Sequence, residues 1–313
     1  MNSALGVDNI RLRAVADTIL YLPLTLAIRT GLFRAEGLDV ELHVPGPGPR
    51  SANAVLGGQA EVALGGIWRP AMYLALRKRL VAFAAIARRC PMFLLSNPEF
   101  VASGWKGLEG RRVILCGDAV SQWVVFRMLC EANHVDISKV RLLPDFQPEE
   151  GAELFAAGVS DYIYIGQPLA EELILSDKAH LLVTFAEAAG PLPWSVFMAT
   201  PKFLSDRRDS ASRFVRALQN ALKQISDQKP AQLAEAAHAA FSSTSSSTLE
   251  QVIARYKQLG AWPGSTRIES ADLASWERML VLQGVLSPPV DWAAIVDNSF
   301  AEAAATEVVR GSA

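Results

Sequence analysis

The chain of 313 residues has few cysteines and histidines and lacks the motifs of the common catalytic centres. Its three cysteines, Cys90, Cys116 and Cys130, are too scattered for a disulfide framework or a Cys-x-x-Cys metal site, so we interpret them as buried structural thiols. The four histidines lie far apart along the chain, and no HExxH, GxSxG or P-loop motif is present. These absences disfavour catalysis by a metal centre or an activated nucleophile. We therefore expect no bound metal and no other cofactor.

The chain also lacks an excess of charge of one sign, because 30 Lys and Arg residues face 32 Asp and Glu residues. This balance predicts no general attraction to nucleic acid. No apolar run reaches the length of about 18 residues that a membrane span needs, and the N-terminus lacks the basic, apolar and cleavage segments of a secretory leader. From the sequence as given, we expect a cytoplasmic protein unless the chain has been trimmed.

Half of the residues are hydrophobic and a fifth are charged, which favours a folded protein with a large core. Short apolar runs alternate with amphipathic helical stretches, a pattern typical of an α/β fold. Strands are predicted at 11–16, 40–44, 62–64, 81–87, 92–96, 112–116, 140–143, 162–165, 181–185 and 196–199. After about residue 205 the pattern is helical, which predicts a helical C-terminal cover. Within it, Ser247 and Glu250 predict a capping box for a helix that ends at Gly260.

Two segments about 100 residues apart share one pattern. In 56–66 and in 155–166, a helix end is followed by a glycine turn, an acidic residue three positions after that glycine, a short strand and a glycine-bearing loop. This echo predicts two α/β lobes of related build. Ligands of such sheets bind outside the carboxyl ends of the strands, so the loops 65–69 and 166–168 are predicted to face each other across a cleft.

The stretch 22–42 resembles the P-x-x-x-A-x-x-x-G-x-F-x-x-x-G-L-x-V opening of the solute-binding proteins of ABC importers, with Pro23, Ala27, Gly31, Phe33 and Gly37 at the matching positions. Further matches occur at 56–66, 108–113, 158–168 and in the tail 284–300, so the resemblance covers about residues 8–301. The most similar group comprises the nitrate, sulfonate and taurine (SsuA-like) receptors and the NMT1/THI5-like proteins.

This resemblance implies a type II periplasmic-binding-protein-like fold, with a ligand cleft between two lobes. Lobe one would comprise 8–88 plus 196–313 and lobe two 96–188, with chain crossings near 89–95 and 189–195. Two crossings permit hinge closure on a ligand, which is the signal that a transporter reads. The expected partners are a small-molecule ligand and an ABC permease, and we expect a monomer. The family is periplasmic, in contrast to the location that the missing leader predicts.

Lobe one supplies most of the candidate ligand-binding residues. These are Asp17, Thr18, Tyr21, Ser51, Gly65, Gly66, Trp68 and Arg69. Paired glycines admit a ligand close to the backbone, and Arg69 offers a bidentate fork for a carboxylate, sulfonate or phosphate. The alternative is that Tyr21 and Trp68 are core residues, that Arg69 is solvated, and that Ser51 is only a helix N-cap.

Lobe two and the second crossing supply the remaining candidates. These are Asp118, Ser121, Gln122, Trp123, Gly166, Gln167, Trp194 and Ser195. Asp118 and Ser121 are equally candidates for helix capping. The tryptophans among the candidates favour a ligand with an aromatic or apolar body, and Arg69 favours an anionic head group.

These observations predict a substrate-binding protein that closes on a small organic anion and has no catalytic residues of its own. One alternative is a cytoplasmic enzyme of the same fold, either a decarboxylase of aromatic acids or a desulfinase-like protein. Desulfinases resembling this chain have a cysteine nucleophile in the first loop, where Thr18 stands here, while Asp17 or Asp118 could serve a decarboxylase as acid or base. A ligand sensor is the other alternative.

Overall fold

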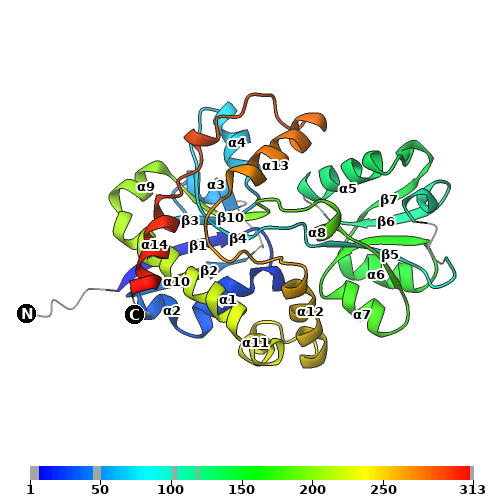
Figure 1. The fold of residues 1–313 in the computed structure, drawn as a ribbon, viewed down its shortest axis with the longest axis horizontal. Helices are drawn as coiled ribbons and strands as arrows, with labels where there is room; N and C mark the ends of the chain where they lie inside the picture. The colour runs from blue at the N-terminus through cyan, green and yellow to red at the C-terminus, as the bar shows by residue number, and fades with distance from the viewer. Residues whose placement is uncertain (1–6, 45–50, 101–103, 118–119, 311–313) are drawn as a thin grey trace, which may run out of the picture. The chain divides into compact units, whose positions relative to one another are not determined.

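Ten strands form two five-stranded sheets, one in each of two units of the computed structural model, which describes residues 7–44, 51–100, 104–117 and 120–310 (Figure 1). Unit 1 is drawn from Met1–Arg88, Pro193–Phe241 and Trp262–Ala313, and unit 2 from Arg89–Leu192 and Ser242–Ala261. Helices accompany both sheets. The α/β prediction is confirmed, and all ten predicted strands are present.

The two sheets have the same plan. Unit 1 has the order β2-β1-β3-β10-β4, with β1 Asp8–Ala14, β2 Leu38–His43, β3 Val62–Gly65, β4 Val81–Ala87 and β10 Ser195–Ala199. Unit 2 has the order β7-β6-β8-β5-β9, with β5 Met92–Ser96, β6 Arg112–Cys116, β7 Arg141–Phe146, β8 Tyr162–Gly166 and β9 His180–Thr184. In each sheet the second strand is parallel to both of its neighbours, and the fourth strand is antiparallel to both of its own.

Helices fill the intervals between the strands and make up most of the last third of the chain. Those of unit 1 are α1 Leu22–Arg29, α2 Leu32–Ala35, α3 Ser51–Leu56, α4 Trp68–Ala75, α9 Pro201–Asp206, α10 Arg208–Asp227, α11 Pro230–Ala237, α13 Ser270–Leu282 and α14 Ser299–Arg310. Those of unit 2 are α5 Val120–Ala132, α6 Pro148–Ala156, α7 Leu169–Leu175, α8 Phe185–Ala188 and α12 Ser246–Gln258. Single 3₁₀ turns lie at Ile19–Tyr21, Trp105–Leu108, Ile137–Lys139, His238–Ala240 and Trp292–Ala294.

The sequence echo corresponds to one ionic clasp that occurs in both units. In unit 1, Glu61 accepts hydrogen bonds from the backbone N–H of Arg11 at 2.8 Å and from its Nη2 at 2.6 Å, and the same Nη2 donates to the Gly58 carbonyl. In unit 2, Asp161 accepts from the backbone N–H of Arg112 at 2.9 Å and from its Nη2 at 3.0 Å.

The second clasp also includes the glycine turn, because Nη2 of Arg112 donates to the Gly158 carbonyl. Gly58 and Gly158 have φ values of +72° and +81°, which glycine adopts at little cost. Each acidic residue immediately precedes β3 or β8, and each arginine lies on the neighbouring parallel strand. The clasp therefore sets the register of the two strands whose carboxyl ends carry the candidate binding loops.

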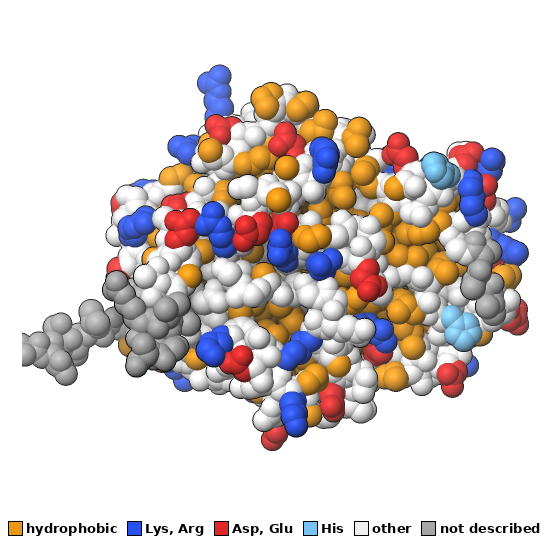
Figure 2. Space-filling model, viewed as in Figure 1, with side chains coloured by type: hydrophobic (Ala, Val, Ile, Leu, Met, Phe, Trp, Pro, Cys, Tyr) orange, Lys and Arg blue, Asp and Glu red, His pale blue; other side chains and the backbone are white. Residues whose placement is uncertain are grey.

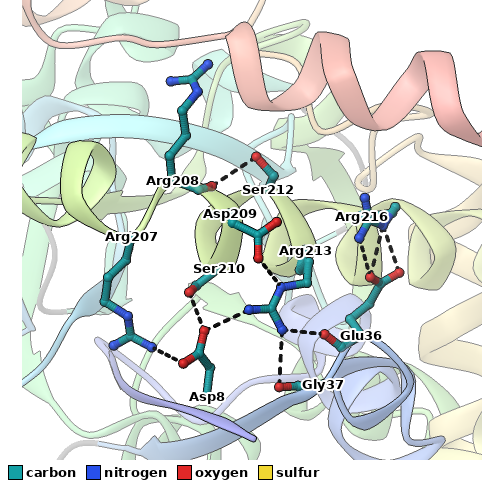
Figure 3. A network of polar contacts seen from close by, with 10 residues as sticks. All are labelled: Asp8, Glu36, Gly37, Arg207, Arg208, Asp209, Ser210, Ser212, Arg213 and Arg216. Carbon is teal, nitrogen blue, oxygen red and sulfur yellow. Dashed lines mark hydrogen bonds and ion pairs between the residues drawn. The ribbon is translucent and has the colours of Figure 1, made fainter. Parts of the chain in front are cut away.

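The long helix α10 packs on the sheet of unit 1 through an apolar face, and ion pairs at the border of this face add to the contact. Phe214 packs on Phe33, Phe83 and Phe197, with ring centroids 4.9–6.1 Å apart. At the border, Arg213 Nη2 donates to Asp8 at 2.7 Å, and the adjacent helical turns add further ion pairs (Figure 3). The predicted helical cover thus shares one core with the first sheet.

Helix α12 belongs to unit 2, whereas the sequence analysis assigned everything after residue 196 to the first lobe. Arg255 donates to the buried carboxylate of Glu171 through Nε at 2.5 Å and Nη2 at 2.8 Å, and Tyr256 packs 6.4 Å from Phe93. The N-cap of this helix is Ser245, which accepts from the N–H of Thr248 at 3.1 Å, so the N-cap lies two residues before the predicted Ser247 and the predicted capping box with Glu250 is wrong.

The clasp of unit 2 can be tested through its acid dependence. Burial opposes ionisation of Asp161, but the hydrogen bonds from Arg112 outweigh it and lower the pKa of the carboxyl group. Asp161→Asn should therefore lower the free energy of unfolding of unit 2 by about 2 kcal/mol at pH 7. Because the pKa is lower in the folded state, this contribution is lost as the pH falls below about 4. Urea unfolding at neutral and acidic pH measures both effects.

The matched control is Glu153→Gln, which removes an exposed carboxylate from the same unit. Equal losses of stability in the two variants, or an Asn variant whose unfolding keeps the acid dependence of the wild type, would contradict the role of the clasp.

Candidate functional site

The loops after β1 and β3 bring three predicted residues of unit 1 together. Tyr21 is 6% exposed and hydrogen-bonds with Ser195, the first residue of β10. Burial raises the pKa of Tyr21 to about 12, although the hydrogen bond with Ser195 and the positive charge of Arg69 partly oppose this. The phenol is therefore neutral at physiological pH, and the guanidinium of Arg69 is close enough to act on it.

The turn at 65–69 shapes the surroundings of Arg69. The guanidinium carbon lies 4.6 Å from the centroid of the Trp68 ring, a cation–π geometry. The indole folds back over Gly66, where an added Cβ would lie only 2.5 Å from the Trp68 Nε1. A Cβ on Gly65 would come within 3.0 Å of Val15 and 3.4 Å of Arg69. A side chain at Gly66 would therefore displace the Trp68 indole, whereas one at Gly65 would require smaller shifts of its neighbours.

For the other predicted residues of unit 1, the structure shows an exposed position, a capping role or burial. Asp17 is exposed, and the Thr18 hydroxyl accepts from the N–H of Leu20 as the cap of a 3₁₀ turn. Trp194 is 9% exposed and packs 6.1 Å from Trp276. The side chain of Ser51 is buried at the start of α3, and its hydroxyl forms no hydrogen bond with a described residue.

Unit 2 contains a pocket of about 300 Å³ at the carboxyl end of β6. β6 contributes Leu115 and Cys116, and β7 contributes Leu142 and Pro144. Gly117, which follows β6, also lines the pocket and has a φ of +155°. Gln122 and Trp123 were predicted from the sequence, but the contribution of β7 was missed, because only the sheet brings that strand beside β6.

The remaining lining residues of this pocket are Gln122, Trp123 and Tyr164. An added Cβ at Gly117 would lie 1.9 Å from Oε1 of Gln122, so the absence of a side chain at Gly117 makes room for the Gln122 amide. Trp123 stacks on Phe126 with centroids 6.0 Å apart and ring planes at 14°. Tyr164 is 2% exposed and donates to the backbone carbonyl of Gln122 at 3.0 Å.

The other predicted residues of unit 2 whose positions the structure describes do not line the pocket. The Gln167 side-chain amide forms two hydrogen bonds with Glu171. Its Oε1 accepts from the Glu171 backbone N–H at 3.0 Å, and its Nε2 donates to the Glu171 carboxylate at 3.1 Å. Gly166, at the end of β8, is half-buried, and Ser121 is buried in the first turn of α5. Asp118 lies outside the described residues.

The three thiols are buried, as expected from the sequence. Burial raises the pKa of Cys90, Cys116 and Cys130 to about 12 in each case. Within the described part of the chain, no three His, Cys, Asp or Glu side chains are grouped so that they could hold a metal ion. Among these same residues, no helix has both the length and the apolar character needed to cross a membrane.

Comparisons with known proteins agree with this architecture. A family model described as NMT1/THI5 like matches residues 20–232. YtlA of Bacillus subtilis strain 168 is 22% identical over 305 residues, which is 96% of this chain and 91% of YtlA. The alkanesulfonate-binding protein SsuA from Xanthomonas axonopodis pv. citri, solved bound to MOPS, has a TM-score of 0.73 at 17% identity and covers 95% of this chain and 100% of its own. The desulfurization enzyme DSZB has a TM-score of 0.72 at 16% identity, with coverages of 96% and 99%.

The chain therefore has the two-sheet α/β fold of the periplasmic-binding-protein-like proteins. Because the family model spans about two thirds of its length, the chain belongs to the NMT1/THI5-like family, and the resemblance found in the sequence is confirmed. The fold supports both binding proteins and an enzyme, so function must be argued from the residues.

The thiol environments predict that the native protein is inert toward thiol reagents. Ellman's reagent reacts with thiolates, and a pKa of about 12 leaves almost none at pH 8. We expect no rapid colour development from native protein and release from all three thiols in concentrated guanidinium chloride. A thiol that reacts within seconds in the native state would contradict this and reveal an activated cysteine.

Proposed function

We propose that this protein is the substrate-binding component of an ABC importer and that it binds a small organic anion with an apolar or aromatic body by closure of its two units. The named relatives support the class of function: SsuA is an alkanesulfonate-binding protein, and YtlA is named as a candidate binding protein. The partner of the closed form would be an ABC permease, and the binding protein itself would act as a monomer.

The observation that carries the proposal is the position of Arg69 in unit 1. A guanidinium placed one turn beyond β3, beside a neutral buried phenol, is suited to bind the head group of an anion through paired N–H donors. Tyr21 and Ser195 hydrogen-bond with each other there, which provides polar atoms that carry no negative charge to compete with the ligand. A sulfonate or carboxylate has the oxygen spacing that such a fork accepts.

The face of the molecule drawn in Figure 2 shows no basic patch among its described residues. On the face shown in Figure 2, Lys and Arg side chains are interspersed with Asp and Glu side chains, so the described residues of this face form no large area of one sign. Because the chain has a formal net charge of −2, we expect a small anion to be recognised by a local positive group and not by the field of the whole molecule.

Catalysis is the second candidate function, and the likeness to DSZB is the observation that favours it. Here the first loop has Thr18, whose hydroxyl is engaged in capping, in place of the cysteine found in desulfinases. Cys116, the cysteine that lines the pocket, has a pKa raised to about 12 by burial and by the charge of Glu149. Incubation with an aromatic sulfinate separates the two functions, since a binding protein returns the compound unchanged.

The test of the proposal is the effect of Arg69→Ala on anion binding. A thermal-shift panel of sulfonates, aromatic acids, nitrate and pyrimidines first identifies anions that stabilise the protein, and titration calorimetry then gives their dissociation constants. The variant should bind about 10- to 100-fold more weakly, because a charged hydrogen bond contributes about 1.5–3 kcal/mol. Arg69→Lys should recover only part of this loss, because Lys lacks the planar fork.

Arg34→Ala is the matched control, since it removes an exposed arginine of the same unit. If Arg69→Ala and Arg34→Ala both leave the dissociation constants of the anions unchanged, Arg69 does not bind the head group.

A further inference from the structure

We propose that the pocket of unit 2 is a subsite for a neutral aromatic group about two rings in size, which forms the body of the transported molecule. The inference deepens the proposed function and rests on it for the existence of an organic ligand. The observations that support it all concern the pocket of unit 2.

The size of the pocket limits its occupant. Its volume is about 300 Å³. An apolar cavity of about 150 Å³ holds one benzene ring, so this pocket has room for roughly two rings. It also lies at the lower end of the range of about 300–1,000 Å³ that is usual for sites of small organic ligands. A bare inorganic anion such as nitrate would leave most of this space unfilled.

The lining disfavours a charged occupant. None of the described residues that line the pocket carries a formal charge, and charged side chains lie only near them, with the guanidinium carbon of Arg127 5.7 Å from the Trp123 ring centroid and Glu149 acting on Cys116. The Cys116 thiol remains protonated because burial raises its pKa to about 12. The Tyr164 hydroxyl already donates to the Gln122 carbonyl. An ionised group placed here would lose hydration without meeting a charged side chain in the lining itself, which is costly. The part of the ligand that enters is therefore neutral, with the Gln122 amide as its polar neighbour.

The walls favour an aromatic occupant over an alkyl chain. Trp123 presents an indole that is 37% exposed and whose plane is held by stacking on Phe126 at 14°. Tyr164 is held in turn by a tilted ring contact with Phe126 at a centroid distance of 5.2 Å and by an edge contact with Phe185 at 4.6 Å. Rigid aromatic walls gain additional stacking energy from a flat ring, whereas an alkyl chain gains only apolar burial.

The sulfur and the proline complete a slot of low polarity. Cys116 is held in place because Gly151 of α6 packs so closely that an added Cβ there would lie 2.3 Å from the sulfur. Pro144 and Leu142 lie on β7, an edge strand that pairs with β6 alone. Because Leu142 is half-buried and Pro144 is exposed, larger side chains at these two positions can fill the slot without entering the core.

The experiment uses the full chain and three probes: 2-naphthol, which is neutral at pH 7, 2-naphthalenesulfonate, and octan-1-ol as the aliphatic comparison. Dissociation constants are measured by calorimetry for the wild type and for Leu142→Trp and Pro144→Trp, two variants that fill the slot independently. Leu175→Trp is the matched control, because it places the same side chain at an exposed leucine on α7 of the same unit.

We expect 2-naphthol to bind the wild type roughly fivefold more tightly than octan-1-ol. Both slot-filling variants should weaken 2-naphthol by about tenfold or more, and the control should not. Absence of 2-naphthol binding, equal binding by all four proteins, or tighter binding of octan-1-ol would each overturn the inference.

This experiment can contradict either the head-group proposal or the aromatic subsite without contradicting the other. 2-Naphthol needs no guanidinium, so Arg69→Ala should leave its binding unchanged while weakening 2-naphthalenesulfonate. If the sulfonate is insensitive to Arg69→Ala but the naphthol is sensitive to Leu142→Trp, the head-group assignment is wrong and the aromatic subsite stands. The reverse result preserves the anion site and removes the aromatic subsite.

Discussion

One ionic clasp occurs in both units and fixes the strand alignment that positions the candidate binding loops. An acidic residue directly before the third strand of each sheet binds both the backbone N–H and the side chain of an arginine on the neighbouring parallel strand. Glu61 with Arg11 and Asp161 with Arg112 thereby set the alignment of two strand pairs. A slip of one residue would turn every side chain of a strand to the opposite face. The clasps therefore place the carboxyl ends of β3 and β6, next to which Arg69 and the apolar pocket are found.

The positively charged candidate residue and the apolar pocket belong to different units. Unit 1 holds Arg69 near the neutral Tyr21, and unit 2 holds a pocket whose described lining residues carry no formal charge. This separation fits an amphiphilic ligand better than a nitrate-sized anion, and it matches the proposal that one molecule offers an anionic head and an apolar body. The three thiols are buried, and the Thr18 hydroxyl caps a 3₁₀ turn.

The C-terminal part of the chain is shared between both units, which local sequence patterns did not reveal. Helix α10 covers the first sheet through Phe214, whereas α12 joins the second unit through Arg255 and the buried Glu171. Both helices are amphipathic, and amphipathicity shows that a helix covers an apolar surface without identifying that surface. Arg255, the partner of the buried Glu171 carboxylate, is 84 residues away along the chain, so this pairing can be recognised only in the three-dimensional structure.

The sequence alone determined the elements and their duplication. All ten strands were predicted, and three of them (β4, β5 and β6) have the predicted bounds. β4 and β5 are buried at every residue, and a strand covered on both faces is apolar throughout and so easy to recognise. The echo of 56–66 in 155–166 indicated the two units before any contact was known.

Only the tertiary structure decided which candidates meet. It placed Tyr21 beside Ser195 across 174 positions of sequence, packed Trp194 against Trp276, and joined Leu142 to Cys116 in one pocket. The physical reason is that an apolar period of two residues in a strand, or of 3.6 residues in a helix, indicates which face of that element is buried. The residues that cover this face depend on how elements far apart in the sequence pack together.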